Sequence, residues 1–164
     1  MKGILECCVD SVESAIAAKN GGADRLELCQ GLVIGGGAPG TALFQGIKNQ
    51  MDIRIHALMR PRFGDFCYTR HEIDILCEDI RTFRKLGADA AVIGALKPDG
   101  TLDVEAMKRM IDAAGDGDRA GKTQGSDLAD DLFFGVRAAV GQKKLHGITL
   151  LFSMGFCAGK KGRI

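Results

Sequence analysis

Four short apolar segments, each followed by an amphipathic one, succeed one another through the first two thirds of the chain. The expected strands cover residues 4–9, 25–29, 53–59 and 90–96, and the expected helices begin near residues 10, 41, 69 and 103. The clearest helical period lies in residues 69–86, where apolar side chains recur every three or four residues at Ile73, Leu76, Cys77, Ile80 and Phe83. Strand and helix units in this order predict parallel strands joined by right-handed crossovers, and therefore an α/β fold.

The ends of these elements carry further signals. Asp10 followed by Glu13 resembles a capping box that opens the first helix. The sequence Gly-Ala-Asp occurs twice, at residues 22–24 and 87–89, and each time we expect it to join the end of a helix to the start of a strand. The apolar side of the fourth helix is expected to carry Val104, Met107, Met110, Ile111 and Ala114.

Composition narrows the class of protein. The chain has 164 residues, 46% of them hydrophobic, which fits a globular protein with its own core. Its 22 basic and 21 acidic residues are spread along the sequence, so we expect no nucleic-acid partner. No apolar run approaches the roughly 20 residues that span a bilayer, and Met1 leads directly into a strand pattern. We therefore expect a cytoplasmic protein without a membrane partner.

The cysteines match no zinc-finger or Cys-x-x-Cys spacing, so we interpret them as free thiols. The first two strands nevertheless share an arrangement: Glu6 and Cys8, and likewise Glu27 and Cys29, stand two residues apart and thus on one side of their strand. Adjacent strands lie about 4.8 Å apart, which would bring Cys8 and Cys29 close enough to share a soft metal such as Cu(I). The alternative for each cysteine is simple packing as a small hydrophobic residue.

Charged side chains also gather around the third strand and the loop after it. His56 and Arg60 share a strand face, and Arg62 and Asp65 follow in the loop. Buried carboxylates need partners, and we expect Arg54, Arg60 and Arg62 to pair with the two strand glutamates. Such pairing would form either a structural ion-pair layer or an anion-binding pocket, in which His56 could carry a proton or serve only the structure.

A glycine-rich loop, residues 31–40, follows the second strand. Its backbone N–H groups could cradle a phosphate, but it matches neither a dinucleotide-binding fingerprint nor a Walker A motif. We interpret it as a plain loop.

Three motifs in order resemble the CutC copper homeostasis family: residues 6–14 (ECCVDSVES), 20–29 (NGGADRLELC) and 60–68 (RPRFGDFCY). Residues 87–89 and 94–96 support the likeness, which covers about residues 3–116. The resemblance implies a cytoplasmic TIM-type (β/α)8 barrel that is associated with copper tolerance and binds Cu(I). By this likeness Cys8 and Cys29 are the copper ligands, and Glu6, Glu27, Arg60, Arg62 and Asp65 line the pocket.

The sequence departs from the family pattern in two places. The glycine-rich loop lacks the family's Glu, Thr and Ser, and residues 117–164 resemble none of the family's later βα units. A barrel of this type needs about 250 residues. We therefore expect a truncated family member with about four βα units in residues 1–116. A divergent tail would follow in residues 117–164, with a possible helix at 127–142 and strand at 147–152. A half barrel leaves open strand edges, which makes a homo-oligomer possible.

Three functions remain open at this point. The first is copper homeostasis through Cu(I) bound by cysteines. The second is a TIM-barrel enzyme that fixes a small anionic substrate with arginines and uses a glutamate as general base. The third is an inactive truncated fragment.

Overall fold

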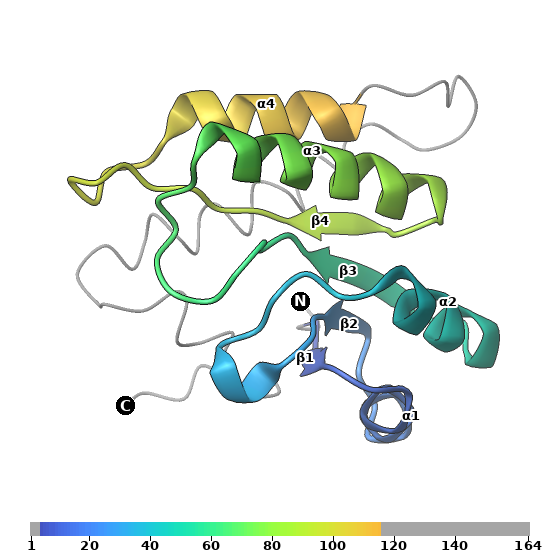
Figure 1. Ribbon diagram of the computed structural model, residues 1–164. Coiled ribbons are helices and arrows are strands. Elements are labelled where there is room, and N and C mark those ends of the chain that lie inside the picture. Colours follow the sequence, from blue (N-terminus) through green and yellow to red (C-terminus); the bar gives the residue numbers. More distant parts are fainter. Residues whose placement is uncertain (1–3, 116–164) are drawn as a thin grey trace.

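Strands and helices alternate through the computed structural model, which describes residues 4–115 (Figure 1). The strands are β1 (Glu6–Val9), β2 (Arg25–Leu28), β3 (Arg54–Leu58) and β4 (Ala90–Val92). The helices are α1 (Val12–Asn20), α2 (Thr41–Gln50), α3 (Arg70–Lys85) and α4 (Val104–Gly115), and a short 3-10 helix, η1 (Leu32–Ile34), precedes α2. The predicted α/β fold is confirmed. The predictions for residues 117–164 fall outside the described residues.

The strands form a parallel sheet in the order β1-β2-β3-β4. Each new βα unit is therefore added at the same edge, as in a TIM-type barrel, whereas a doubly wound sheet reverses direction. Figure 1 shows α3 and α4 side by side next to β4, and α1 and α2 near the other end of the sheet. The carboxyl ends of all four strands meet at one edge, where the loops that carry chemistry gather.

The core lies between the sheet and its helices. It contains the strand residues that point toward the helices, together with the predicted apolar stripe of α3: Cys7, Val9, Leu26, Leu28, Ile55, Ala57, Ile73, Leu76, Cys77, Ile80 and Phe83. Phe44 of α2 meets Phe83 of α3 edge to face, with ring centroids 5.5 Å apart. This aromatic pair joins two helices across the core.

The predicted start of α1 was wrong by one residue. Ser11 caps the helix: its Oγ accepts the N–H of Ser14, and the Ser14 Oγ accepts the N–H of Ser11, both at 3.1 Å. Asp10 instead accepts the N–H of Leu32 at 3.2 Å and so connects the end of β1 to η1. A carboxylate at a helix start can serve either purpose, and the fold of the following loop decides which.

The predictions for β4 and α4 also need correction. β4 ends at Val92 rather than at residue 96, because the chain turns away and Leu96 pairs with Leu102. In α4 the buried residues are Ala106, Met107, Met110 and Ala113, whereas Val104 and Ile111 are 54% and 43% exposed. The helix offers two adjacent apolar stripes, and its contact with α3 selects one of them.

Both Gly-Ala-Asp sequences form the same junction. Gly22 and Gly87 end their helices with φ of 92° and 89°, a left-handed conformation that favours glycine. The aspartate that follows then reaches the neighbouring strand: Asp24 accepts the N–H of Leu5, and Asp89 accepts the N–H of Ile55, both at 2.8 Å. The repeat therefore fixes where β2 and β4 each meet the preceding strand.

We expect Phe44→Ala to destabilise the fold by about 3–5 kcal/mol, because it removes a fully buried ring and leaves a cavity beside Phe83. Urea unfolding followed by circular dichroism measures the loss. The matched control is Phe63→Ala, the same substitution at a side chain that is 68% exposed, and it should change stability by about 0.5 kcal/mol or less. Equal effects of the two substitutions would contradict the core described here.

Candidate functional site

The face of the sheet that points away from the helices carries the polar strand residues. The parallel register places Cys8 opposite Glu27, and Glu27 opposite His56, in one row across three strands. Glu6 and Arg25 form the next row toward the amino ends of β1 and β2. The prediction that Glu6, Cys8 and Glu27 share a face is therefore confirmed, and His56 joins them.

Glu6 is neutralised by a residue that the sequence reasoning missed. Its Oε2 accepts a hydrogen bond from Nε of Arg25 and lies 3.5 Å from Nδ1 of His56. The expected partners Arg54, Arg60 and Arg62 were wrong, because Arg54 is exposed and the other two point into loops. Arg25 could have been found, since it has the same strand parity as Glu27 and stands opposite Glu6 once the strands are paired.

Glu27 and Cys8 form a buried polar pair. The Cys8 Sγ donates to Oε2 of Glu27 at 3.0 Å, and Glu27 is 1% exposed. Burial raises the pKa of the Glu27 carboxyl from 4.5 to about 8. Burial, followed by the charge of Glu27, also raises the pKa of the Cys8 thiol far above its ordinary value. Near neutral pH the pair is therefore largely uncharged.

Cys29 lies just beyond β2, one row closer to the carboxyl ends of the strands. Its Sγ donates to the carbonyl of Val9 at 3.4 Å, and burial raises the pKa of its thiol to about 12. Cys29 is also close enough to Cys8 for its charge to raise the pKa of Cys8, after the larger effects of burial and Glu27. The two cysteines are thus diagonal neighbours on adjacent strands. Within residues 4–115, no three His, Cys, Asp or Glu side chains form a group that could hold a metal ion.

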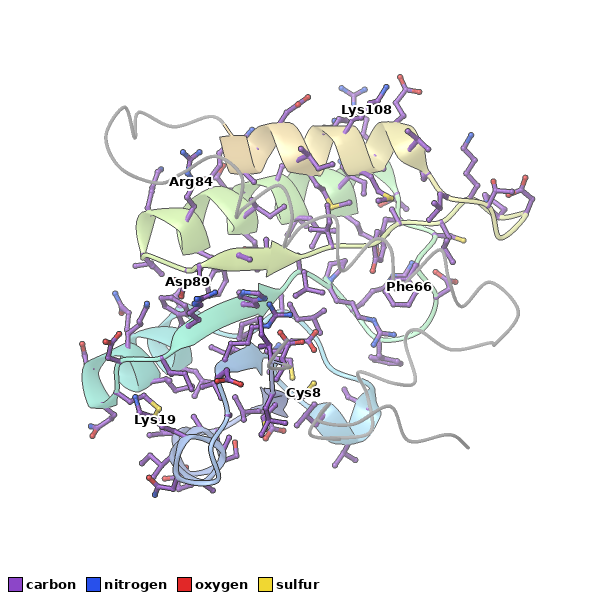
Figure 2. The ribbon with its side chains drawn as sticks, turned by 180° about the vertical axis from the view of Figure 1, so that it is seen from behind. Cys8, Lys19, Phe66, Arg84, Asp89 and Lys108 are labelled. Atoms are coloured by element: carbon purple, nitrogen blue, oxygen red, sulfur yellow. The ribbon has the colours of Figure 1, made fainter. Side chains whose placement is uncertain are left out.

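Arg60 joins two loops beyond the strands. Its guanidinium donates to the carbonyls of Gly35, of Gly36 (3.0 Å) and of Gly64 (2.7 Å), and it lies over the ring of Phe66 at 4.9 Å from the centroid. Figure 2 shows Phe66 well apart from Cys8. The structure therefore separates Arg60 from the glutamate and cysteine row with which the sequence grouped it.

The glycine-rich loop presents its carbonyls, rather than its N–H groups, to Arg60. The N–H groups of Gly35, Gly36, Gly37 and Ala38 all donate to backbone carbonyls of residues 30–32 and 60. A Cβ at Gly36 would meet the side chain of Leu58 at 3.1 Å, so the loop packs closely on β3. These contacts argue against a phosphate cradle and agree with the interpretation of a plain, though well-packed, loop.

Arg62 and Asp65 organise the loop before α3. Nε of Arg62 donates to Glu72 at 2.5 Å, and its Nη2 donates to Asp65 at 3.1 Å and to the Cys67 carbonyl at 3.0 Å. The Arg62 bond and the Cys67 N–H lower the pKa of Asp65. Glu72, which the sequence reasoning missed as a partner, also completes the capping box of α3 with Thr69. Arg62 and Asp65 are therefore engaged within their own loop.

A parallel sheet wound in one direction, with helices on one face and functional loops at the carboxyl ends, defines an α/β protein of the TIM-barrel class. The comparisons with known proteins agree. The sequence model of the CutC family matches residues 3–121, and the chain belongs to the CutC family. Among relatives, it is 48% identical to the human copper homeostasis protein cutC homolog, over 62% of this chain and 37% of that protein.

Two further likenesses extend this picture. A CutC family protein of Histophilus somni is 38% identical over 83% of this chain and 56% of its own length. The crystal structure of a CutC protein from Streptococcus agalactiae superposes with a TM-score of 0.64 at 29% identity, covering 70% of this chain and 56% of that one. The chain thus spans 37% to 56% of these relatives. No helix in residues 4–115 is long and apolar enough to cross a membrane.

Replacing Glu27 should change how stability depends on pH. The folded protein keeps the Glu27 proton up to about pH 8, whereas the unfolded chain releases it near 4.5. Stability from this group is thus complete below 4.5 and is lost as the pH rises through about 8. Glu27→Gln has no proton to lose at this position. The free energy of unfolding of the variant minus that of the wild type should therefore increase by a few kcal/mol as the pH rises from about 5 to about 8.

Urea unfolding at a series of pH values measures this difference. Glu13→Gln, the same substitution at an exposed glutamate of α1, is the matched control. A difference between Glu27→Gln and wild type that stays constant with pH would show that Glu27 is ionised in the folded protein.

Proposed function

We propose that this chain acts in copper homeostasis in the cytoplasm by binding Cu(I), as cargo, through the thiolates of Cys8 and Cys29. The single observation that carries the proposal is the placement of these two thiols as diagonal neighbours on adjacent parallel strands. The human relative's name, copper homeostasis protein, supports the same direction.

The chemistry of the two thiols fits a soft cation better than a hard one. Thiolate ligands select Cu(I), which needs few ligands, while hard cations require several oxygen donors. Cys8 and Cys29 are free thiols and both lie near carboxyl ends of the strands, on the face away from the helices. Both are held protonated, so Cu(I) would have to displace their protons, and the metal's charge would stabilise the resulting thiolates.

Glu27 gives this pair a specific environment. Its Oε2 accepts a hydrogen bond from Sγ of Cys8, which fixes where that thiol lies. Because burial keeps the Glu27 carboxyl protonated near neutral pH, the protons that Cu(I) displaces from the thiols would pass to solvent. The neighbouring Arg25 and Glu6 neutralise each other, which keeps a fixed positive charge away from an incoming cation.

The alternative of an enzyme acting on a small anion through Glu6, Glu27, Arg60, Arg62 and Asp65 has less support from the geometry. The five residues form separate groups: Glu6 is paired with Arg25, and Arg62 with Asp65 and Glu72. No described contact joins Glu27 to Arg60 or Arg62. A substrate held by both arginines beside a glutamate base would require those loop contacts to break.

Anaerobic competition titration with a Cu(I) chelator tests the proposal. The reduced protein should bind about one Cu(I) per chain, and Cys8→Ser/Cys29→Ser should lose at least tenfold in affinity, because a hydroxyl is a poor ligand for a soft metal. The matched control is Cys67→Ser/Cys77→Ser, which removes two thiols from the loop and helix that follow β3 and should leave binding unchanged.

Equal affinity of the wild type and the Cys8/Cys29 variant would overturn the proposal. A thermal melt of each apo variant accompanies the titration, so that loss of binding is separated from loss of folding.

A further inference from the structure

Arg60 is a buried cation without a carboxylate partner in the described part of the chain. It is 3% exposed, and every hydrogen bond that its guanidinium makes there goes to a neutral backbone carbonyl, at Gly35, Gly36 and Gly64. Buried charges in proteins are normally paired, because carbonyl dipoles alone compensate desolvation incompletely. Arg25, which is the other buried arginine among residues 4–115, follows this rule through its ion pair with Glu6.

The edge of the Arg60 guanidinium that carries Nε and Nη2 is where a carboxylate partner would bind. Among residues 4–115, Nε of Arg60 is buried and has no acceptor. Nε lies on the same edge as Nη2, which carries two N–H groups and has Gly64 as its one described acceptor. This edge is the one through which arginine takes a carboxylate with two parallel hydrogen bonds.

A second unpaired donor belongs to the same aromatic cluster. The hydroxyl of Tyr68 is buried and without a partner in the described residues. Arg60 lies over Phe66, the rings of Phe66 and Tyr68 are 6.1 Å apart, and the charge of Arg60 acts on the Tyr68 hydroxyl. Burial raises the pKa of Tyr68, which keeps its hydroxyl a hydrogen-bond donor.

The acidic side chains of the neighbouring loop and helix start already form ion pairs with another arginine. Asp65 and Glu72 both bind Arg62, and Glu72 also caps α3. No carboxylate of the described loop is therefore left to neutralise Arg60.

We propose that Arg60 and Tyr68 form a binding site for the carboxylate of a small organic acid, which accepts hydrogen bonds from the Nε edge of Arg60 and from the Tyr68 hydroxyl. A carboxylate fits the charge, since one negative charge balances one buried guanidinium, and its planar shape matches the guanidinium edge. The site lies at the carboxyl end of β3, where TIM-type barrels bind ligands. Figure 2 shows Phe66, over which Arg60 lies, well apart from Cys8.

The site can be tested by following the Nε–Hε resonance of Arg60 in the reduced, copper-free protein while sodium acetate is added. The resonance should shift and saturate, with no comparable shift in sodium chloride or sodium phosphate at equal ionic strength. Arg81, whose guanidinium donates to Glu78 on α3 at 3.3 Å, is an internal control that should not respond.

Tyr68→Phe is the decisive variant, because it removes a hydroxyl that makes no described hydrogen bond and leaves the ring in place. Acetate affinity should fall about 5- to 10-fold, the worth of one hydrogen bond. Arg60→Lys, checked by a thermal melt, should abolish binding.

No saturable shift with acetate, an equal response to chloride or phosphate, or unchanged affinity in Tyr68→Phe would each overturn this assignment. Neither Arg60 nor Tyr68 contributes to the proposed copper site. A negative acetate titration would therefore leave the copper proposal standing, and a negative Cu(I) titration would leave the carboxylate site standing.

Discussion

Within residues 4–115, the helices cover one face of the parallel sheet, and the arrangement of the polar residues depends on that constraint. Side chains alternate between the two faces of a strand. Cys7, Val9, Leu26 and Leu28 therefore enter the core between sheet and helices, while Glu6, Cys8, Arg25 and Glu27 are turned to the opposite face. These polar groups are also largely withdrawn from water, so they must satisfy one another. Glu6 does so through an ion pair with Arg25. Glu27 does so by accepting a hydrogen bond from Cys8 and by keeping its own carboxyl proton.

The same strand alignment accounts for the two kinds of site. Asp24 and Asp89 each accept a backbone N–H next to or within the preceding strand. The bond of Asp24 helps to set the register of β1 and β2, which places Cys8 opposite Glu27 and Cys29 next to Val9. Beyond the strands, the loops are held together by arginines. Arg60 donates hydrogen bonds to carbonyls of two loops, and Arg62 forms ion pairs with Asp65 and Glu72. A thiol pair within the sheet and a cationic cluster above it are therefore distinct, although both lie toward the ligand-binding end of the fold.

Local patterns could predict much of this architecture. The spacing of Ile73, Leu76, Ile80 and Phe83 identified the buried side of α3, because a helix with one apolar stripe has one way to pack. The alternation in β1 and β2 likewise identified which face carries the glutamates. Prediction failed at Val104 and Ile111, where two apolar stripes competed and only contact with α3 could choose between them. It failed again at the arginines, whose long side chains reach partners that sequence proximity does not reveal.

The sequence by itself therefore determined the class of fold, the faces of its strands and the presence of a carboxylate and a thiol two residues apart along each of the first two strands. Each of these depends on short-range periodicity, which the backbone geometry of a helix or strand imposes directly. Tertiary structure alone decided that Arg25 neutralises Glu6, that Glu27 is protonated by burial, and that Arg60 faces carbonyls instead of a glutamate. Those outcomes depend on strand register, loop packing and exclusion of water, which arise only when distant segments meet.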